Sequence, residues 1–512
     1  MSPEAILSEK PDIVLVENHD TRIDAEKQSQ VKVIDSLSVW GLGAEDEAFY
    51  NSSMTAEQRE KLKHKVDIRL IPMLAILYLV SHLDRANIGN AKIEGLVHDL
   101  KLKNTEYNII PSNMVLNKLK RPSIYIGALV TAPGIVMTLH GVVNNFAGLL
   151  AVRLLLGVFE SGFYPAAIYL CTCWYMPNDL ATRIPYFYST SALSGAFSGL
   201  LAAGITKMDG LGGYEGWRWI FILEGLFTIV LGFSCFFLLV DSPGWLTDNE
   251  IRFIELQNFI KSGGGIPEQT AGNNKKIDWY NVKKIFANWQ IYLQSYILLC
   301  MAACSFGIKF TLPSITKNMG FTNTNAQLMT APAYVAGAIS AIIFARLSDR
   351  FRWRMPFVAI PLSFIIIGFA IVMGLQGNLA GRHLGPGYFA VVLACMGIYP
   401  IQPAGLSWSS NNLSPASRRA IGVGFNVAIG NIGGIIAGYM YLESEAPRYQ
   451  TGYGLSLAFG ASGLICAMVL EISYVWSNKQ REKISEEEIR SRYTEQELLK
   501  LGDKSPRFKY IL

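Results

Sequence analysis

LIPMLAILYLVSHLDRANIGNA, residues 70–91, is an apolar run long enough to cross the roughly 30 Å hydrocarbon core of a bilayer as a helix. Ten further runs of this kind follow, at about 123–143, 147–173, 184–206, 217–240, 290–312, 326–346, 355–376, 386–408, 420–442 and 452–476. Of the 512 residues, 51% are hydrophobic and 17% are charged, whereas soluble chains carry about 25% charged residues. We therefore predict an all-α protein with many membrane-spanning helices.

The basic residues lie mostly between the apolar runs or in the tails, and this pattern sets orientation in a membrane. A basic cluster from Arg59 to Arg69 precedes the first run, so we expect a cytosolic N-terminus. The predicted organisation is a cytosolic tail at 1–67, a helix bundle at 68–240, a central cytosolic loop at 241–289, a second bundle at 290–477 and a cytosolic tail at 478–512. A polar loop between two groups of spans is expected in a duplicated transporter.

Two polar segments carry local signals. In the central loop, Thr247 and Glu250 have the spacing of a capping box before an amphipathic run, which predicts the start of a helix. Between two later spans, residues 345–354 read ARLSDRFRWR. Asp349, Arg350 and Arg354 are expected to hold helix ends together by ion pairs at the cytosolic face. A loop that only sets orientation is the alternative.

Four ionisable residues stand inside apolar spans, where a charge is expensive and functional by default. Asp84 and Arg85 lie late in the first span, and Arg153 and Glu160 lie two helical turns apart in the third predicted run. Arginine holds a carboxylate through two parallel hydrogen bonds. A buried carboxyl group can bind and release a proton near neutral pH. The four residues therefore predict an anion site beside a proton site, with purely structural ion pairs as the alternative.

The motifs around these residues resemble a known family. LDRANIGNAKIEGL (83–96), RLLLGVFESGFYPAAIY (153–169), GWRWIFILEGL (216–226) and the exit DSPGWL (241–246) are similar to the anion:cation symporter branch of the major facilitator superfamily, and above all to its fungal allantoate-permease-like members. The resemblance covers about 61–477. It implies two bundles of six helices, a central binding site and alternating access.

The resemblance also implies roles for individual residues. In this branch a first-span arginine contacts the substrate carboxylate, its aspartate neighbour and a fourth-span glutamate carry protons, and a second arginine balances the charge. These roles fall on Arg85, Asp84, Glu160 and Arg153. Further residues expected to face the substrate are Asn87, Tyr296, Gln402 and Asn426, with interhelical hydrogen bonds as the alternative. Lys309 departs from the family pattern. It is either a snorkelling side chain or a second anion contact.

The predicted function is proton-coupled symport of a small carboxylate, such as a vitamin, a ureide or an organic acid. An exporter of a fungal metabolite and a non-transporting nutrient sensor are the alternatives.

The histidines and cysteines show no spacing typical of a metal site or of catalysis, so no enzyme activity and no cofactor are expected. The net charge of +5 is spread out and does not suggest nucleic-acid binding. We expect a monomer in the plasma membrane.

One span is missing from this scheme. The basic flank Arg59–Arg69 and the cluster Lys118–Arg121 both indicate the cytosol, so an even number of crossings must separate them. Only one full apolar run lies between. The longest apolar stub after it, Ile109–Leu116, contains Pro111 and is far shorter than the roughly 20 residues that a span needs. Family members carry a complete second span here, between Tyr107-Asn108 and the motif Pro111–Asn113. The second helix is therefore truncated or missing.

We predict that the loss lies between the codons for Asn108 and Ile109, because only Ile109 and Ile110 separate the family's two flanking motifs there. Sequencing the transcript across these codons distinguishes two causes. Additional apolar codons would identify a wrongly drawn intron boundary. A continuous transcript without them would exclude that cause and leave a deletion in the gene itself.

Overall fold

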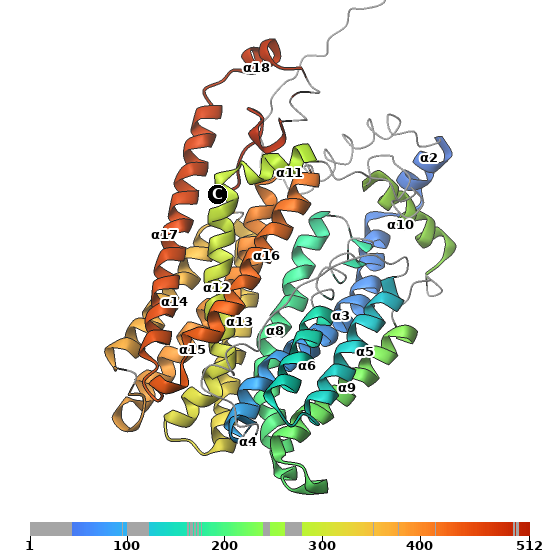
Figure 1. Cartoon of the computed structure of the whole chain (residues 1–512). Coiled ribbons are helices and arrows are strands. Elements are labelled where there is room, and N and C mark those ends of the chain that lie inside the picture. Colours follow the sequence, from blue (N-terminus) through green and yellow to red (C-terminus); the bar gives the residue numbers. More distant parts are fainter. Residues whose placement is uncertain are drawn as a thin grey trace, which may run out of the picture. The chain divides into compact units, whose positions relative to one another are not determined.

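A computed structural model gives the fold of the chain (Figure 1). It describes residues 44–94, 96–99, 122–160, parts of 161–175, 177–238, 246–261, 279–494 apart from three single positions, 497 and 501–512. Most of the expected N-terminal tail, the middle of the central loop and the stub at 109–116 lie outside the described residues. The chain divides into two compact units, Met1–Leu62 with Pro243–Asn274, and Lys63–Ser242 with Lys275–Leu512.

The first unit joins α2 (Ala44–Ser52) to α10 (Asp248–Lys261). Tyr50 stacks on Phe253 with ring centroids 5.0 Å apart, and Arg252 forms an ion pair with Asp46 at 2.8 Å. The capping box is confirmed. The Thr247 N–H donates to the Glu250 carboxylate at 2.8 Å, and the Glu250 N–H donates to the Thr247 hydroxyl at 3.4 Å.

The second unit contains the long apolar helices, and each of the eleven predicted spans coincides with a helix or with its described part. Their bounds are α3 (Ala56–Ile93, which begins in the first unit), α5 (Pro122–His140), α6 (Phe146–Glu160), α8 (Pro177–Ile205), α9 (Gly216–Leu238), α12 (Trp289–Asn318), α13 (Asn323–Phe351), α14 (Pro356–Gly374), α15 (Leu384–Asn411), α16 (Ala416–Met440) and α17 (Gln450–Arg481). Eight described helices are long and apolar enough to cross a membrane. The described elements are all helices, which confirms the predicted class.

Short helices accompany the long ones. These are α4 (Leu96–Asp99), α11 (Trp279–Phe286), α18 (Glu486–Arg492) and single 3-10 turns in the loops. The structure describes no helix between α4 and α5, and residues 100–121 lie outside its described part. We refer to α3–α9 as the first half and to α12–α17 as the second half.

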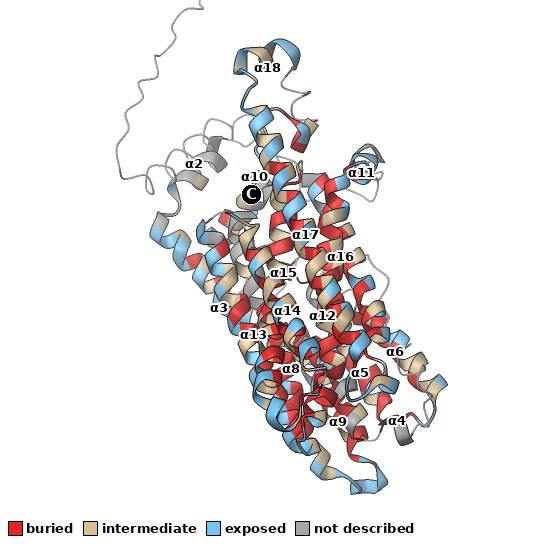
Figure 2. Cartoon of the chain, turned by 90° about the vertical axis from the view of Figure 1, so that its left-hand side faces the viewer, coloured by how far each residue is buried: buried red, intermediate tan, exposed pale blue. Residues whose placement is uncertain are grey.

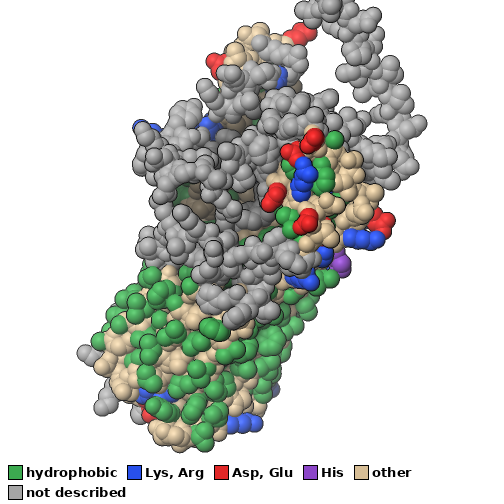
Figure 3. All heavy atoms as spheres, turned by 90° about the vertical axis from the view of Figure 1, so that its right-hand side faces the viewer, with side chains coloured by type: hydrophobic (Ala, Val, Ile, Leu, Met, Phe, Trp, Pro, Cys, Tyr) green, Lys and Arg blue, Asp and Glu red, His purple; other side chains and the backbone are tan. Residues whose placement is uncertain are grey.

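Figure 2 shows that buried residues lie along the sides of the long helices that face other helices. The buried residues include polar side chains such as Asp84, Asn87 and Asn426, whereas many large hydrophobic side chains are exposed. Figure 3 shows one face of the molecule, with a broad area of hydrophobic side chains and few charges. On α9 this pattern includes Phe227, Val230 and Phe233, which are 53%, 62% and 60% exposed. Exposing so wide a surface of large hydrophobic side chains to water would be energetically unfavourable, whereas contact with lipid carries no such cost.

Glycine allows the two halves to approach closely where α8 packs along α13. A Cβ added at Gly195 would lie 2.7 Å from the ring of Tyr334, and one added at Gly199 would lie 2.6 Å from the Gln327 carbonyl oxygen. The two glycines are four residues apart and therefore share one face of α8. This small-xxx-small pattern is how membrane helices bring their backbones together.

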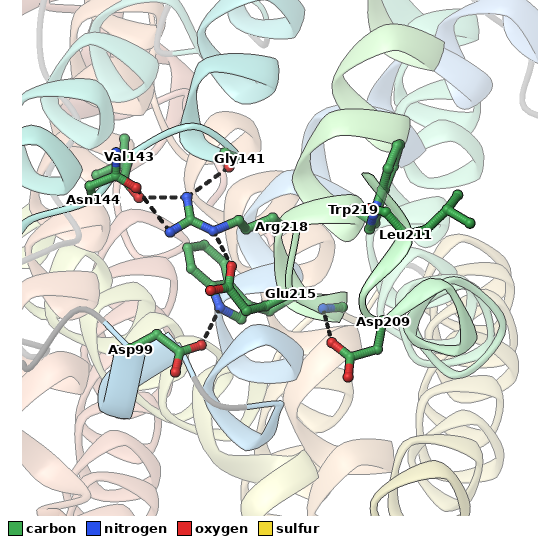
Figure 4. Close-up of polar contacts among 11 residues, drawn as sticks. Asp99, Gly141, Val143, Asn144, Asp209, Leu211, Glu215, Arg218 and Trp219 are labelled. Carbon is green, nitrogen blue, oxygen red and sulfur yellow. Dashed lines mark hydrogen bonds and ion pairs between the residues drawn. The ribbon is translucent and has the colours of Figure 1, made fainter. Parts of the chain in front are cut away.

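The GWRW motif at the start of α9 organises the loops at one end of the first half (Figure 4). Arg218 donates from one nitrogen to the carbonyls of Gly141 and Val143, at 3.0 and 2.8 Å, and from another to Asn144 at 3.0 Å. Its Nε pairs with Glu215. Trp217 is fully buried and donates to Asp99, at the end of α4, at 2.8 Å.

The C-terminal tail lies against the other end of the second half. The Ile511 carbonyl accepts from Trp408 of α15 at 3.0 Å and from Asn412, the residue that caps the end of α15, at 2.9 Å. Arg418 of α16 forms an ion pair with Asp503 at 3.1 Å, and both side chains are less than 5% exposed. Burial raises the pKa of Asp503, and the Arg418 guanidinium opposes that rise. The tail thus ties α15 to α16.

We predict that Arg218→Lys destabilises the protein by on the order of 3 kcal/mol, because a lysine cannot reach the two carbonyls and Asn144 together and leaves buried acceptors unpaired. The melting temperature of the detergent-solubilised protein measures this loss. Trp219→Phe is the matched control, since Trp219 makes one hydrogen bond, to the exposed Leu211 carbonyl at 3.1 Å. Equal melting temperatures for Arg218→Lys and Trp219→Phe would contradict the prediction.

Candidate functional site

An ion pair joins α3 to α6 at the centre of the first half. Arg85 donates from Nε to Oε2 of Glu160 at 2.8 Å. The Glu160 side chain is 3% exposed and the Arg85 side chain is 19% exposed. In the described part of the chain the two Nη nitrogens of Arg85 donate no hydrogen bond to protein. The guanidinium is therefore held by one edge, and its other edge is available.

Asp84, the neighbour of Arg85, is fully buried. Neither of its carboxylate oxygens has a hydrogen-bond partner in the described part of the chain, and the same holds for Oε1 of Glu160. Four charged groups act on the Asp84 carboxylate, namely Glu160, Glu224, Arg153 and Arg85. Buried polar atoms are nearly always paired in native proteins. Unpaired carboxylate oxygens at this depth indicate a place for a proton or a water.

Glu224 of α9 belongs to the same cluster, although it was not predicted. It is 5% exposed, and Asn87 of α3 donates to its Oε2. Ser198 of α8 donates to the Asn87 carbonyl at 2.8 Å and accepts from Asn90 at 2.6 Å. The network thereby joins three helices. The rule that selected Glu160, an acid inside an apolar run, applies equally to Glu224 within GWRWIFILEGL.

The cluster contains more acids than bases. Its three carboxylates are Asp84, Glu160 and Glu224, and its two guanidiniums are Arg85 and Arg153. Arg153 is 8% exposed and lies over the ring of Phe221, 5.5 Å from its centroid. Because net charge is costly at this depth, one bound proton would leave the cluster neutral.

A small cavity adjoins these acids. Its lining includes Asp84 and Glu160 with Ser81, Thr228 and Pro133, which lies inside α5. It offers about 10 Å³, which is roughly the space that one water molecule needs. A water there would have hydroxyl and carboxylate partners. The cavity therefore provides a site beside Asp84 through which a proton could pass.

Two polar contacts cross between the halves near Arg85. Tyr188 of α8 donates to Oε1 of Gln402 in α15. The Lys309 ammonium of α12 lies 3.2 Å from Nδ1 of His82 in α3. Lys309 is 2% exposed. The snorkelling interpretation of Lys309 is therefore wrong, because the side chain points into the protein instead of toward an aqueous surface.

Two other predicted residues have partners within the second half. The Tyr296 hydroxyl lies 3.0 Å from Oγ of Ser462 in α17. Asn426 is fully buried, donates to Ser409 at 2.6 Å and accepts from Ser295 at 2.6 Å. These contacts match the interhelical hydrogen bonds considered as the alternative.

The predicted gating residues lie where α13 ends and α14 begins. Asp349 is in α13, but its side chain lies outside the described part, and Arg350 is exposed. Arg354 donates to the Ser348 hydroxyl at 2.8 Å, and its backbone N–H donates to the carbonyl of Leu512. The segment is thus in contact with the C-terminal residue.

Apolar helices that enclose paired charges at their centre are the architecture of a membrane transporter. The family model of the Major Facilitator Superfamily matches residues 74–438. The chain therefore belongs to this superfamily of membrane transporters. Its fold is similar to that of a bacterial homologue of the human lysosomal transporter Spinster, with a TM-score of 0.55 at 15% identity over 78% of this chain and 95% of the other. The nucleoside transporter NupG also gives 0.55, at 11% identity over 79% and 99%.

The curated relatives are fungal. An uncharacterized transporter of Schizosaccharomyces pombe is 33% identical over 90% of this chain and 92% of its own length. The high-affinity nicotinic acid transporter of Saccharomyces cerevisiae is 32% identical over 97% and 92%. The MFS-type transporter cnsO of Penicillium expansum is 31% identical over 89% and 91%. The alignment with the nicotinic acid transporter extends over 513 positions, more than this chain has residues, as expected if the relative contains a segment that is absent here.

We predict that Glu224→Gln leaves the melting temperature unchanged or raises it, because the amide oxygen still accepts from Asn87 and one surplus negative charge is removed. Arg153→Met should cost about 3 kcal/mol, since it leaves three carboxylates beside one guanidinium. That cost should shrink as the pH falls, because protonated carboxyl groups no longer need the cation. Thermal unfolding of both variants in detergent at several pH values measures this. A loss for Glu224→Gln as large as that for Arg153→Met would contradict the proposed charge balance.

Proposed function

We propose that this transporter carries small carboxylates in symport with protons, as an allantoate-permease-like member of the anion:cation symporter branch. The proposal rests on the contact between Arg85 and Glu160. In this contact the guanidinium donates to the carboxylate through Nε, at 2.8 Å, and its two Nη nitrogens do not take part. A substrate carboxylate can bind the free edge of the guanidinium by the forked contact that arginine favours.

The same contact supplies a mechanism for coupling. A substrate anion at Arg85 competes with Glu160 for the positive charge. A buried carboxylate that loses its counter-ion is stabilised by taking up a proton. Asp84 is adjacent, and its two oxygens have no hydrogen-bond partner among the residues that the structure describes, so it is the second proton carrier, and Arg153 balances the remaining charge. Substrate and proton would therefore bind together and leave together.

The substrate class rests on this chemistry and on one relative. The nicotinic acid transporter of Saccharomyces cerevisiae is 32% identical to this chain and is named for a small carboxylate. Arg85, Asn87 and Gln402 are the proposed substrate contacts, because they lie at or beside the charged cluster and the junction of the halves. Tyr296 and Asn426 are retained as weaker members of the set.

We further propose a monomer in the plasma membrane with both termini in the cytosol. The basic residues before α3 support this orientation. The bundles at 68–240 and 290–477 would rock against each other in alternating access, and the central segment 241–289 would connect them. Asp349, Arg350 and Arg354 would then restrain the cytosolic end of α13 during that motion.

The test is uptake of radiolabelled carboxylates, nicotinate among them, into cells that express the chain, at acidic and at slightly alkaline external pH, with and without an uncoupler. We expect accumulation at acidic pH that the uncoupler abolishes. Glu160→Gln should lose accumulation while keeping exchange of internal for external substrate, because the amide cannot carry the proton. Glu487→Gln, at an exposed position of α18, is the matched control. Full accumulation by Glu160→Gln would mean that the proton site lies elsewhere.

A further inference from the structure

Lys309 is a buried cation at the junction of the two halves. Its ammonium is 3.2 Å from Nδ1 of His82 and 5.9 Å from the centroid of the Tyr399 ring. These residues belong to α12, α3 and α15, so both halves contribute to its surroundings. The side chain is 2% exposed. Lys309 thus lies where the two bundles meet and not on an outer face.

The partners of Lys309 leave its charge uncompensated. Imidazole and phenol rings are neutral acceptors, and Lys309 forms no salt bridge with a carboxylate in the described part of the chain. Glu160 of the central cluster is already bonded to Arg85 at 2.8 Å. A buried charge that lacks its counter-ion is strongly destabilising. The ammonium can therefore donate a further hydrogen bond to an acceptor on a bound molecule.

Aromatic rings line the surroundings of this pair. Tyr78 meets His82 edge to face at 4.5 Å, and its ring lies 5.8 Å from that of Tyr188. Tyr399 in turn contacts Tyr334 at 6.4 Å. Flat rings with polar edges suit a planar organic molecule better than a hydrated inorganic ion. His82 and Arg85 are three residues apart in α3 and so lie on neighbouring positions of one helix face, which places Lys309, the partner of His82, on the Arg85 side of that helix.

We propose that Lys309 and His82 form a second binding subsite, which takes a hydrogen-bond acceptor on the substrate while Arg85 takes its carboxylate. The substrate class is then a small, planar carboxylate with a second acceptor, such as a ring nitrogen, a carbonyl or another carboxylate. His82 holds the ammonium in position when no substrate is bound. The substrate connects α3 with α12 and so draws the two halves together. This inference rests on the proposed function, since it assigns the carboxylate to Arg85.

Matched ligands test the subsite. Each pair shares a carboxylate and a similar shape, but only one member has the second acceptor. The pairs are nicotinate and benzoate, succinate and butyrate, and 2-oxobutyrate and butyrate. The purified full-length protein is titrated with each ligand, and the rise in melting temperature reports binding. For the wild type we expect at least one two-acceptor ligand to bind about tenfold to a hundredfold more tightly than its partner, as one buried hydrogen bond from a charged donor allows.

Lys309→Met is the decisive variant, and Lys207→Met, at an exposed position, is its matched control. Lys309→Met should abolish the preference by weakening only the two-acceptor ligand. Without ligand, it should melt at or above the wild-type temperature, because an uncompensated buried charge has been replaced by an apolar side chain. A lower melting temperature or a failure to fold would make Lys309 a structural residue and overturn the inference.

The remaining outcomes separate the inference from the proposed function. Wild-type protein that binds the one-acceptor and two-acceptor members equally would overturn the subsite and leave the carboxylate at Arg85 intact. A preference that survives in Lys309→Met would also overturn the subsite alone. If no carboxylate of the panel raises the wild-type melting temperature, both the subsite and the proposed carboxylate transport fail.

Discussion

The ion pair between Arg85 and Glu160 is the interaction on which the rest of the first half depends. Neither charge is tolerable alone between apolar helices, so α3 and α6 must meet where the two side chains can reach each other. The bond of 2.8 Å fixes that meeting point. Asp84, Arg153 and Glu224 gather around it for the same reason, and Asn87 and Ser198 extend the polar contacts to α8 and α9.

Two buried arginines outside the centre, Arg218 and Arg418, are held by several partners each, in contrast to the central cluster. Arg218 satisfies its nitrogens with backbone carbonyls, Asn144 and Glu215, and Arg418 is bonded to Asp503. Such closed networks stabilise helix ends and loops. In the centre, by contrast, neither the Asp84 oxygens nor the Nη nitrogens of Arg85 have a hydrogen-bond partner among the described residues. Incomplete bonding at a buried site is what a protein needs if protons and substrate are to enter and leave.

The junction of the halves combines two kinds of contact. Gly195 and Gly199 allow the backbones of α8 and α13 to approach closely, which gives a shape-dependent contact with little polarity. Tyr188 with Gln402, and His82 with Lys309, add polar contacts that can be broken and remade. In the proposed alternation between two open states, the packed contact would guide the motion, and the polar contacts would break and form again as substrate binds and leaves.

The sequence by itself determined the helical membrane fold and the capping box at Thr247, and it placed apolar runs where the eleven long helices lie. It also singled out Asp84, Arg85, Arg153 and Glu160 as charges inside those runs. These follow from local properties, namely the length of an apolar run and the cost of a charge within it. The pairing of Arg85 with Glu160, the entry of Glu224 into the cluster and the burial of Lys309 against His82 were decided only by the tertiary structure. Each depends on the rotation of one helix relative to another, which is set by packing between residues far apart in the chain and leaves no periodic signal along it.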